Sequence, residues 1–200
     1  MSRALYPKAR FLNERSTKGV RPSFVSEKGL VVELLPYAEK DRGLTLALES
    51  DPQVVGHLGG PVGASEAALV HQRRLAAVAD GDLFYTIETG DAAGPIGIIA
   101  IWRSEWASTT VHELGAMLLP QHQARGIAGR AFDLLLPRAL SSGVSALHAF
   151  PGVTNGPSNA ILRKLRFHRL SDCDLDYEGR PLRCAHWIRN LRDPQPSTLA

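Results

Sequence analysis

The sequence predicts a mixed α/β fold, and two observations carry that prediction. Strand-like segments alternate along the chain with amphipathic segments of helical length, the pattern of a sheet covered by helices. The turn-forming run Gly-Asp-Ala-Ala-Gly-Pro at 90–95 separates two of the strand-like segments and predicts a hairpin. With 200 residues and 44% apolar content, the chain is large enough for one domain with its own core.

The predicted elements follow in chain order. Strands are expected at 30–35, 83–88, 96–103, 111–119, 144–150 and 182–191, and helices at 37–50, 65–80, 126–140 and 157–165. Ser65 is the expected N-cap of the second helix. We expect the apolar face of that helix to hold Ala68, Leu69, Leu75 and Val78, with Arg73 and Arg74 outward. Because Pro137 cannot donate a backbone hydrogen bond, the third helix should kink or end near Leu136.

The net charge of +3 is distributed unevenly. Residues 1–28 hold seven Lys/Arg against two Glu, a net +5, which leaves −2 on the rest of the chain. This division predicts a basic, flexible N-terminal arm at 1–28, one domain at 29–192 and a flexible tail at 193–200. A slightly negative domain is a poor ligand for a phosphate backbone, so nucleic acid is not an expected partner.

No apolar run approaches the length of a membrane span, and no secretory signal is evident, so we expect a cytoplasmic protein without a membrane partner. The chain has two cysteines, Cys173 and Cys184, which do not form a close metal-ligand cluster with histidines. We therefore expect free cysteines and no metal site.

The most informative segment is the loop Gln123-Ala124-Arg125-Gly126-Ile127-Ala128, between a predicted strand and a predicted helix. Small residues there, with Gly129, leave consecutive backbone N–H groups accessible at a helix start, which favours an anion. Arg125 and Arg130 add positive charge suited to phosphate. The loop is neither a Walker loop nor a dinucleotide fingerprint, and a plain strand-to-helix turn is the alternative.

Two motifs together resemble the GCN5-related N-acetyltransferase (GNAT) superfamily. The loop matches its Gln/Arg-x-x-Gly-x-Gly/Ala signature, preceded by His112-Glu113-Leu114-Gly115. The segment 155–167, Asn-Gly-Pro-Ser-Asn-Ala-Ile-Leu-Arg-Lys-Leu-Arg-Phe, resembles the Asn-x-x-Ser segment of the branch that includes the ribosomal-protein Nα-acetyltransferases, the RimJ/RimL-like proteins. The resemblance implies a mostly antiparallel twisted sheet of about seven strands, four main helices and a central parallel strand pair that splays apart.

The resemblance also implies an acetyl-CoA site. The backbone N–H groups of residues 125–129 would bind the cofactor's pyrophosphate, and Asn155 would approach its pantetheine. Main-chain groups of Met117, Leu118 and Leu119 would pair with the pantetheine amides, and an N–H near Leu118 could polarise the thioester. The cofactor-binding set is therefore Met117, Leu118, Leu119, Gln123, Ala124, Arg125, Gly126, Ile127, Ala128, Gly129, Asn155 and Ser158.

Glu113 is the expected general base, because the family's Glu-hydrophobic-Gly pattern is present at 113–115. In a strand, Glu113 and His112 point to opposite faces, so one of the two can face the cleft. Ser158 is the candidate proton donor to the leaving thiolate, and Tyr177 is the alternative. A surface ion pair for Glu113 and ordinary turn roles for Asn155 and Ser158 are the competing interpretations.

By analogy with the family, the loop 57–61, the second helix and the link 102–106 would line the acceptor site. There Trp102 and Trp106 would clamp an amine or peptide, pack the sheet edge, or form a homodimer contact.

Arg166 replaces the glycine that precedes the motif's Phe, which puts the left-handed turn geometry in question.

The function that these features predict is acetyl-CoA-dependent transfer of an acetyl group to a primary amine in a ternary complex. The acceptor would be a protein N-terminus or a small molecule, and acetyl-CoA would be a cosubstrate used without a metal. The alternatives are a catalytically inactive CoA-binding regulatory module and a nucleic-acid-associated protein that uses the basic arm.

Overall fold

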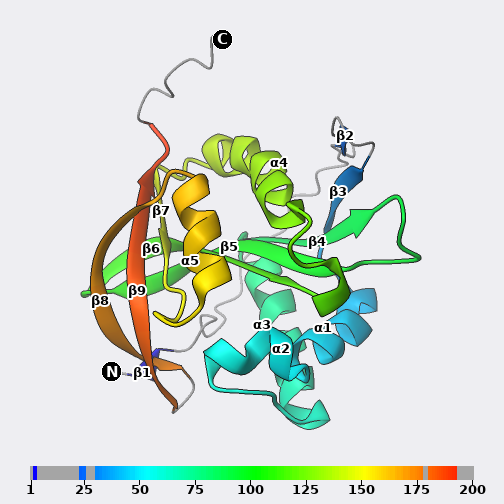
Figure 1. The fold of residues 1–200 in the computed structure, drawn as a ribbon, viewed down its shortest axis with the longest axis horizontal. Coiled ribbons are helices and arrows are strands. Elements are labelled where there is room, and N and C mark those ends of the chain that lie inside the picture. The colour runs from blue at the N-terminus through cyan, green and yellow to red at the C-terminus, as the bar shows by residue number, and fades with distance from the viewer. Residues whose placement is uncertain (1, 4–22, 26–29, 178–179, 193–200) are drawn as a thin grey trace.

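A computed structural model of the chain describes residues 2–3, 23–25, 30–177 and 180–192. Its described strands form one mixed sheet in the order β1-β8-β9-β7-β6-β5-β4-β3-β2 (Figure 1). The strands are β1 Ser2–Arg3, β2 Ser23–Val25, β3 Val31–Pro36, β4 Leu83–Thr89, β5 Gly97–Trp106, β6 Thr109–Leu118, β7 Ala146–Ala149, β8 His168–Tyr177 and β9 Arg180–Asn190.

The expected sheet is confirmed. β3 to β9 are the seven main strands, and the short β1 and β2 extend the two edges. Neighbouring strands pair antiparallel except for β6 with β7 and β1 with β8. The β1 and β2 pairings involve parts of the predicted arm at 1–28, and the rest of that arm lies outside the described residues, as does the predicted tail at 193–200.

Helices cover both faces of the sheet (Figure 1). The described helices are α1 Arg42–Glu49, α2 Pro52–Val55, α3 Ala64–Ala79, α4 Ile127–Ser141 and α5 Gly156–Lys164, with 3₁₀ turns η1 Glu39–Asp41, η2 Gly56–Leu58 and η3 Pro120–His122. One face of the sheet packs on α1 to α3, and the other packs on α4 and α5. Side chains of β5 point alternately to the two faces, so Ile99 and Ile101 pack with α4 and α5 while Ile98 and Ala100 pack with α1 to α3.

The predicted faces of α3 need correction. Gly63, rather than Ser65, is its N-cap, and Leu69 is 62% exposed. Arg74, expected to point outward, is 2% exposed and pairs with the carboxylate of Glu49 on α1. A buried ion partner lets a guanidinium enter a core, and no amphipathic pattern within a single helix shows that partner.

Two further expectations differ from the structure. The helix α4 does not end near Leu136 but continues through Pro137 to Ser141. Packing of Leu135 and Ala139 in the core holds its last turn in place despite the backbone hydrogen bond that Pro137 cannot donate. The strand β8 was not predicted, since it has charged residues at positions 169, 172, 174 and 176 and most of its described side chains are exposed. It is held by its antiparallel pairing with β9.

Candidate active site

The central parallel strands β6 and β7 part after a single register pair. Within the described residues, β6 and β7 are joined by the single register pair Glu113 and His148. β6 continues for five residues beyond Glu113, to Leu118, whereas β7 ends one residue beyond His148. The expected splay is therefore present, and it begins at the predicted catalytic position.

The loop 123–126 leads from the end of β6 into α4. Ala124 and Gly126 both have left-handed backbone, with φ of 57° and 75°. Gly126 is the N-cap of α4, and no side chain caps that helix start. Ile127 is 1% exposed and anchors the first turn in the core, with Ala128 and Gly129 half-buried behind it. This geometry leaves first-turn N–H groups to bind an anion from outside the helix.

The side chains around this loop already have partners. The Arg125 guanidinium lies 2.6 Å from a carboxylate oxygen of Asp91, in the turn between β4 and β5. The hydrogen bond from Arg125 holds the pKa of Asp91 below its usual range. Gln123 donates its side-chain amide to the carbonyl of Leu118 at 3.0 Å, which ties the loop back to β6.

Met117, Leu118 and Leu119, whose main chain is predicted to pair with the pantetheine, are all half-buried. The N–H of Leu119 donates to the carbonyl of Ile96 at 2.9 Å, so this group is engaged within the sheet. The carbonyl of Leu118 accepts the hydrogen bond from the Gln123 side chain. The Met117 sulfur accepts a contact of 3.6 Å from the Arg74 guanidinium. A ligand that pairs with this strand would therefore have to displace Gln123 or use the remaining main-chain groups.

Asn155 and Ser158 come together at the start of α5. The side-chain oxygen of Asn155 accepts from the backbone N–H of Ser158 at 3.1 Å and caps the helix. Among the described residues no hydrogen bond occupies the Ser158 hydroxyl, which is half-buried. Asn155 thus has the ordinary turn role that was the competing interpretation of this residue. That role uses its side-chain oxygen and leaves its NH₂ group as a donor.

Sequence reasoning missed Asn159, which organises the same loop. Its amide nitrogen donates to the carbonyls of Gly152 and Asn155 at 3.0 and 2.8 Å, and its oxygen accepts from the Trp187 indole at 2.9 Å. Asn159 therefore joins the loop 152–155 to β9. The second asparagine in Asn-Gly-Pro-Ser-Asn was the available signal, since a polar residue one turn after a capped helix start can reach back to the loop.

Glu113 and His112 point to opposite faces, as expected. Glu113 is 6% exposed on the α1–α3 face, opposite Trp102 on β5. His112 lines a separate cavity of about 180 Å³ with Asp82 and Arg103. Burial lowers the pKa of His112 there, with Asp82 opposing the shift and Arg103 reinforcing it. Burial raises the pKa of Asp82, against the hydrogen bonds and charge of Arg103. His112 thus faces the α4 side of β6, away from Glu113. The side chain of Tyr177 lies outside the described residues.

Two histidines beside Glu113 were not predicted. His148 is half-buried, and its Nδ1 lies 2.9 Å from Nε2 of His186 on β9, with their ring centroids 5.1 Å apart. The His186 ring also packs on Phe150 and Trp106. Their positions in strand-like segments were the available signal, but nothing in the sequence showed that the two strands are neighbours.

The acceptor-side expectation is partly altered. Residues 102–106 are not a link but the second half of β5, which turns into β6 through Ala107 and Ser108. Trp102 is 5% exposed and packs against Phe84, which supports its sheet-packing role. Gly115 lets the Trp102 ring lie over β6, since a Cβ there would be 2.8 Å from the ring.

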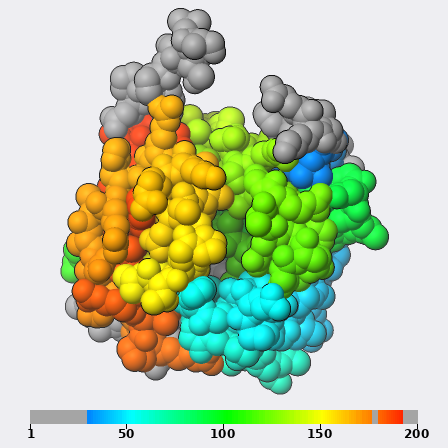
Figure 2. Space-filling model, in the orientation of Figure 1, coloured from blue at the N-terminus to red at the C-terminus, as the bar shows by residue number. Residues whose placement is uncertain are grey.

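The loop 57–60 does lie at the open end of the parted strands. The Arg180 guanidinium donates to the carbonyls of Gly59 and Gly60 at 2.7 and 3.2 Å. The His57 ring lies 3.3 Å from the Thr154 hydroxyl, next to Asn155. Figure 2 shows a hollow between the α5 surface in yellow and the α4 surface in green, bounded below by the cyan segment that contains this loop.

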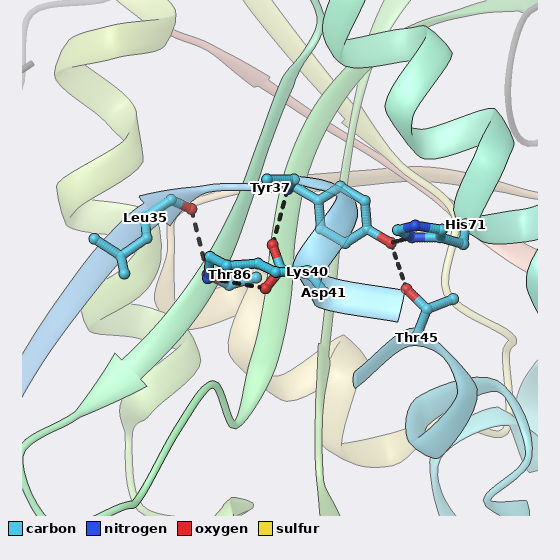
Figure 3. Close-up of polar contacts among 8 residues, drawn as sticks. Leu35, Tyr37, Lys40, Asp41, Thr45, His71 and Thr86 are labelled. Atoms are coloured by element: carbon cyan, nitrogen blue, oxygen red, sulfur yellow. Dashed lines mark hydrogen bonds and ion pairs between the residues drawn. The ribbon is translucent and has the colours of Figure 1, made fainter. Parts of the chain in front are cut away.

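A polar network supports the α1–α3 side (Figure 3). The Tyr37 hydroxyl contacts Thr45 on α1 and, at 2.6 Å, Nδ1 of the fully buried His71 on α3. Thr45 in turn accepts from Arg74 at 3.2 Å. Because Arg74 also reaches Met117, this network connects the helix layer to β6.

Arg166 adopts the left-handed conformation that the family's glycine would provide, with φ of 60°. The N–H of Phe167 donates to Leu162 and the N–H of Arg166 to Arg163, at 3.0 and 3.1 Å. These two bonds form a Schellman end to α5. The turn is therefore retained despite the substitution.

Together, a mixed sheet whose parallel strands part beneath an uncapped helix start defines an acetyltransferase fold. The sequence profile of the Acetyltransferase (GNAT) domain matches residues 32–168, so the chain belongs to the GNAT acetyltransferase family. A comparison with curated protein sequences gave no significant match. Among the described helices, none has the length and apolar character needed to cross a membrane.

Solved structures share the fold at low identity. An acetyltransferase from Salmonella typhimurium that modifies the N-terminal serine of ribosomal protein L7/L12 has a TM-score of 0.65 at 17% identity, covering 80% of this chain and 94% of its own. Mycobacterium smegmatis RimJ, in complex with CoA-disulfide, gives 0.65 at 19%, covering 82% and 85%. Salmonella typhimurium yncA, with acetyl-CoA, gives 0.61 at 17%, covering 85% and 99%.

Proposed function

We propose that this protein is an N-acetyltransferase that transfers the acetyl group of acetyl-CoA directly to a primary amine. The acceptor is a protein N-terminus or a small-molecule amine. The observation that carries the proposal is the parting of β6 and β7 at Glu113 and His148, beside a helix start that has no side-chain cap. Membership of the GNAT family supports acetyl transfer, and the CoA complexes of two structural neighbours support the choice of cofactor.

The cofactor would lie along the gap between the parted strands. The first turn of α4, with the loop 123–126, would bind the pyrophosphate through backbone N–H groups. Residues 117–119 would meet the pantetheine through main-chain groups, and Asn155 would meet it from the opposite wall through its NH₂ group. Each of these groups borders the parted strands or the loops that follow them.

The reaction requires a base and an acid. An alkyl ammonium has a pKa of about 10 and must lose a proton before it attacks the thioester. Glu113, on β6 where the strands part, would take that proton through water. Ser158, whose hydroxyl has no described partner, would protonate the departing thiolate. Direct transfer needs no covalent enzyme intermediate.

The decisive experiment combines binding with turnover. Acetyl-CoA should raise the melting temperature in proportion to RT ln(1 + [L]/Kd), and a panel of amines and N-terminal peptides should include one that triggers release of free thiol. Stabilisation without thiol release across the panel would indicate an inactive CoA-binding module. No stabilisation at millimolar acetyl-CoA would contradict the proposal. Salt-dependent retention on nucleic acid, lost on deletion of residues 1–28, would favour a nucleic-acid role.

A further inference from the structure

The pair His148 and His186 lies at the point where the central strands part. His148 is the register partner of Glu113, so the two side chains lie on the same face of strands about 4.8 Å apart. His148 in turn contacts His186 through Nδ1 and Nε2 at 2.9 Å. One buried carboxylate and two imidazoles in contact with each other therefore lie in a row on one face of β6, β7 and β9.

The proposed reaction releases one proton that the products do not keep. An ammonium R–NH₃⁺ and acetyl-CoA give an amide R–NH–COCH₃, CoA–SH and H⁺. The C–N bond forms, the C–S bond breaks, and of the two protons that nitrogen loses, one goes to sulfur. The other must leave the site in every turnover. A carboxylate that is 6% exposed is a poor place to discharge it directly to bulk water.

We infer that His148 and His186 form a proton outlet for Glu113, an inference that rests on the proposed acetyl transfer. Glu113 takes the proton from the ammonium and passes it to the neutral imidazole of His148. The resulting imidazolium shares its charge with His186 through the Nδ1 and Nε2 contact, and His148, being half-buried, releases the proton to water. Glu113 is then again a carboxylate, ready for the next ammonium.

The surroundings of the pair fit this role. A neighbouring carboxylate favours the protonated form of an imidazole, and unperturbed histidine titrates near neutral pH. Phe150 and Trp106 pack on the His186 ring and fix its orientation. The strand registers also place on this face the carboxylates of Glu33 and Glu88, the thiols of Cys173 and Cys184 and the guanidinium of Arg180. From the helix layer, Arg74, which is paired with Glu49, reaches the same face at Met117. In the part of the chain that the structure describes, no group of three or more His, Cys, Asp or Glu side chains is arranged to hold a metal ion.

Turnover tests the outlet directly. His148→Ala should lower kcat on the order of 10²-fold, with most of the loss at the acidic end of the pH profile, and added imidazole should restore part of kcat. His148→Gln, which retains a hydrogen-bonding side chain but does not titrate, should show the same pH-dependent loss and so covers failure of the alanine variant to fold. His168→Gln is the matched control, because His168 is exposed at the start of β8. Equal kcat and pH profiles in both His148 variants and the wild type would overturn the outlet.

A second measurement does not depend on turnover. In the ligand-free protein, ¹⁵N resonances of His148 and His186 should titrate together, and Glu113→Gln should lower the midpoint of the pair because it removes a neighbouring negative charge. Independent titrations, or a midpoint that Glu113→Gln leaves unmoved, would overturn the inference even if acetyl transfer is confirmed. Absence of thiol release from wild-type protein with every amine would instead overturn the proposed function and the outlet with it.

Discussion

Arg125, in the predicted pyrophosphate loop, is ion-paired at 2.6 Å with Asp91 in the turn between β4 and β5. Both side chains are exposed, so the pair itself adds little stability. Its consequence concerns the ligand, because a guanidinium bound to a carboxylate is less able to bind phosphate. In the proposed cofactor site, Asp91 would therefore compete with the pyrophosphate for Arg125.

Asp91→Asn should tighten acetyl-CoA binding several-fold. The change frees Arg125 and removes a negative charge close to the anion site. Isothermal titration calorimetry at low and high salt would measure the dissociation constant, and the gain should shrink as salt screens the charges.

The matched controls for this experiment are Arg125→Gln and the double variant. Arg125→Gln should weaken binding, and adding Asp91→Asn to it should bring little further gain, because the residue that Asp91 competes for is then absent. If Asp91→Asn tightens binding equally with and without Arg125, the competition does not exist and the effect is long-range charge alone.

Glu113→Gln should lower kcat on the order of 10²-fold below the pH at which the amine acceptor is neutral. The amide keeps the size of the side chain but cannot take a proton. The loss should diminish at alkaline pH, where part of the acceptor is already deprotonated. Glu88→Gln on β4 is the control, and an unchanged pH–rate profile in Glu113→Gln would remove Glu113 as the base.

Asn159→Ala should lower the free energy of unfolding by about 2–4 kcal/mol. It leaves the buried Trp187 indole N–H and the carbonyls of Gly152 and Asn155 without their partner. Urea denaturation measures the change, with Ser141→Ala, an exposed hydroxyl, as control. A loss equal to that of Ser141→Ala would show that the Asn159 bonds do not stabilise the loop.

Arg166→Gly should raise the free energy of unfolding by about 1 kcal/mol. A side chain in left-handed backbone is strained, and glycine removes that strain at the end of α5. The control is Lys164→Gly two residues earlier, inside the helix, where glycine should destabilise by roughly 0.5–1 kcal/mol. Thermal unfolding would compare the two, and opposite signs are expected; a lower melting temperature in Arg166→Gly would contradict the strain.

His112→Gln should flatten the acid dependence of stability. Burial lowers the pKa of His112 below its ordinary value of 6.5, so the unfolded chain binds the proton more readily. Stability is therefore fully present above pH 6.5 and falls as the pH drops from there toward the folded pKa.

Melting temperatures between pH 5 and 8 would compare wild type with His112→Gln, and the variant should lose less stability on acidification. Turnover should stay near the wild-type value, because His112 lies on the face opposite Glu113. A loss of activity comparable to that of Glu113→Gln would instead place His112 in the mechanism.

The sequence predicted the parts of the fold that depend on local pattern. The continuous apolar run of β5 and the turn at 90–95 predicted the hairpin to within a few residues. The loop 123–126 was identifiable because small residues before a helix start permit left-handed backbone, which Ala124 and Gly126 adopt. The roles of that loop and of Ser158 in cofactor binding remain predictions.

The sequence could not predict features that arise between distant segments. Arg74 looked like a surface residue because its partner Glu49 is on another helix. β8 was missed because an exposed polar strand has no apolar period of its own. Asn159 was overlooked because its value depends on Trp187, 28 positions away.

The sequence by itself determined the mixed α/β class, the position of the loop of small residues before α4 and the placement of Glu113 and His112 on opposite faces of their strand, while the anion site and the role of Glu113 as base remain predictions. These follow from backbone geometry and residue size within a short stretch of chain. The tertiary structure alone decided that β6 and β7 part at Glu113 and that His148 and His186 lie beside it. Those relationships depend on strand order and register, which are set by packing across the whole sheet.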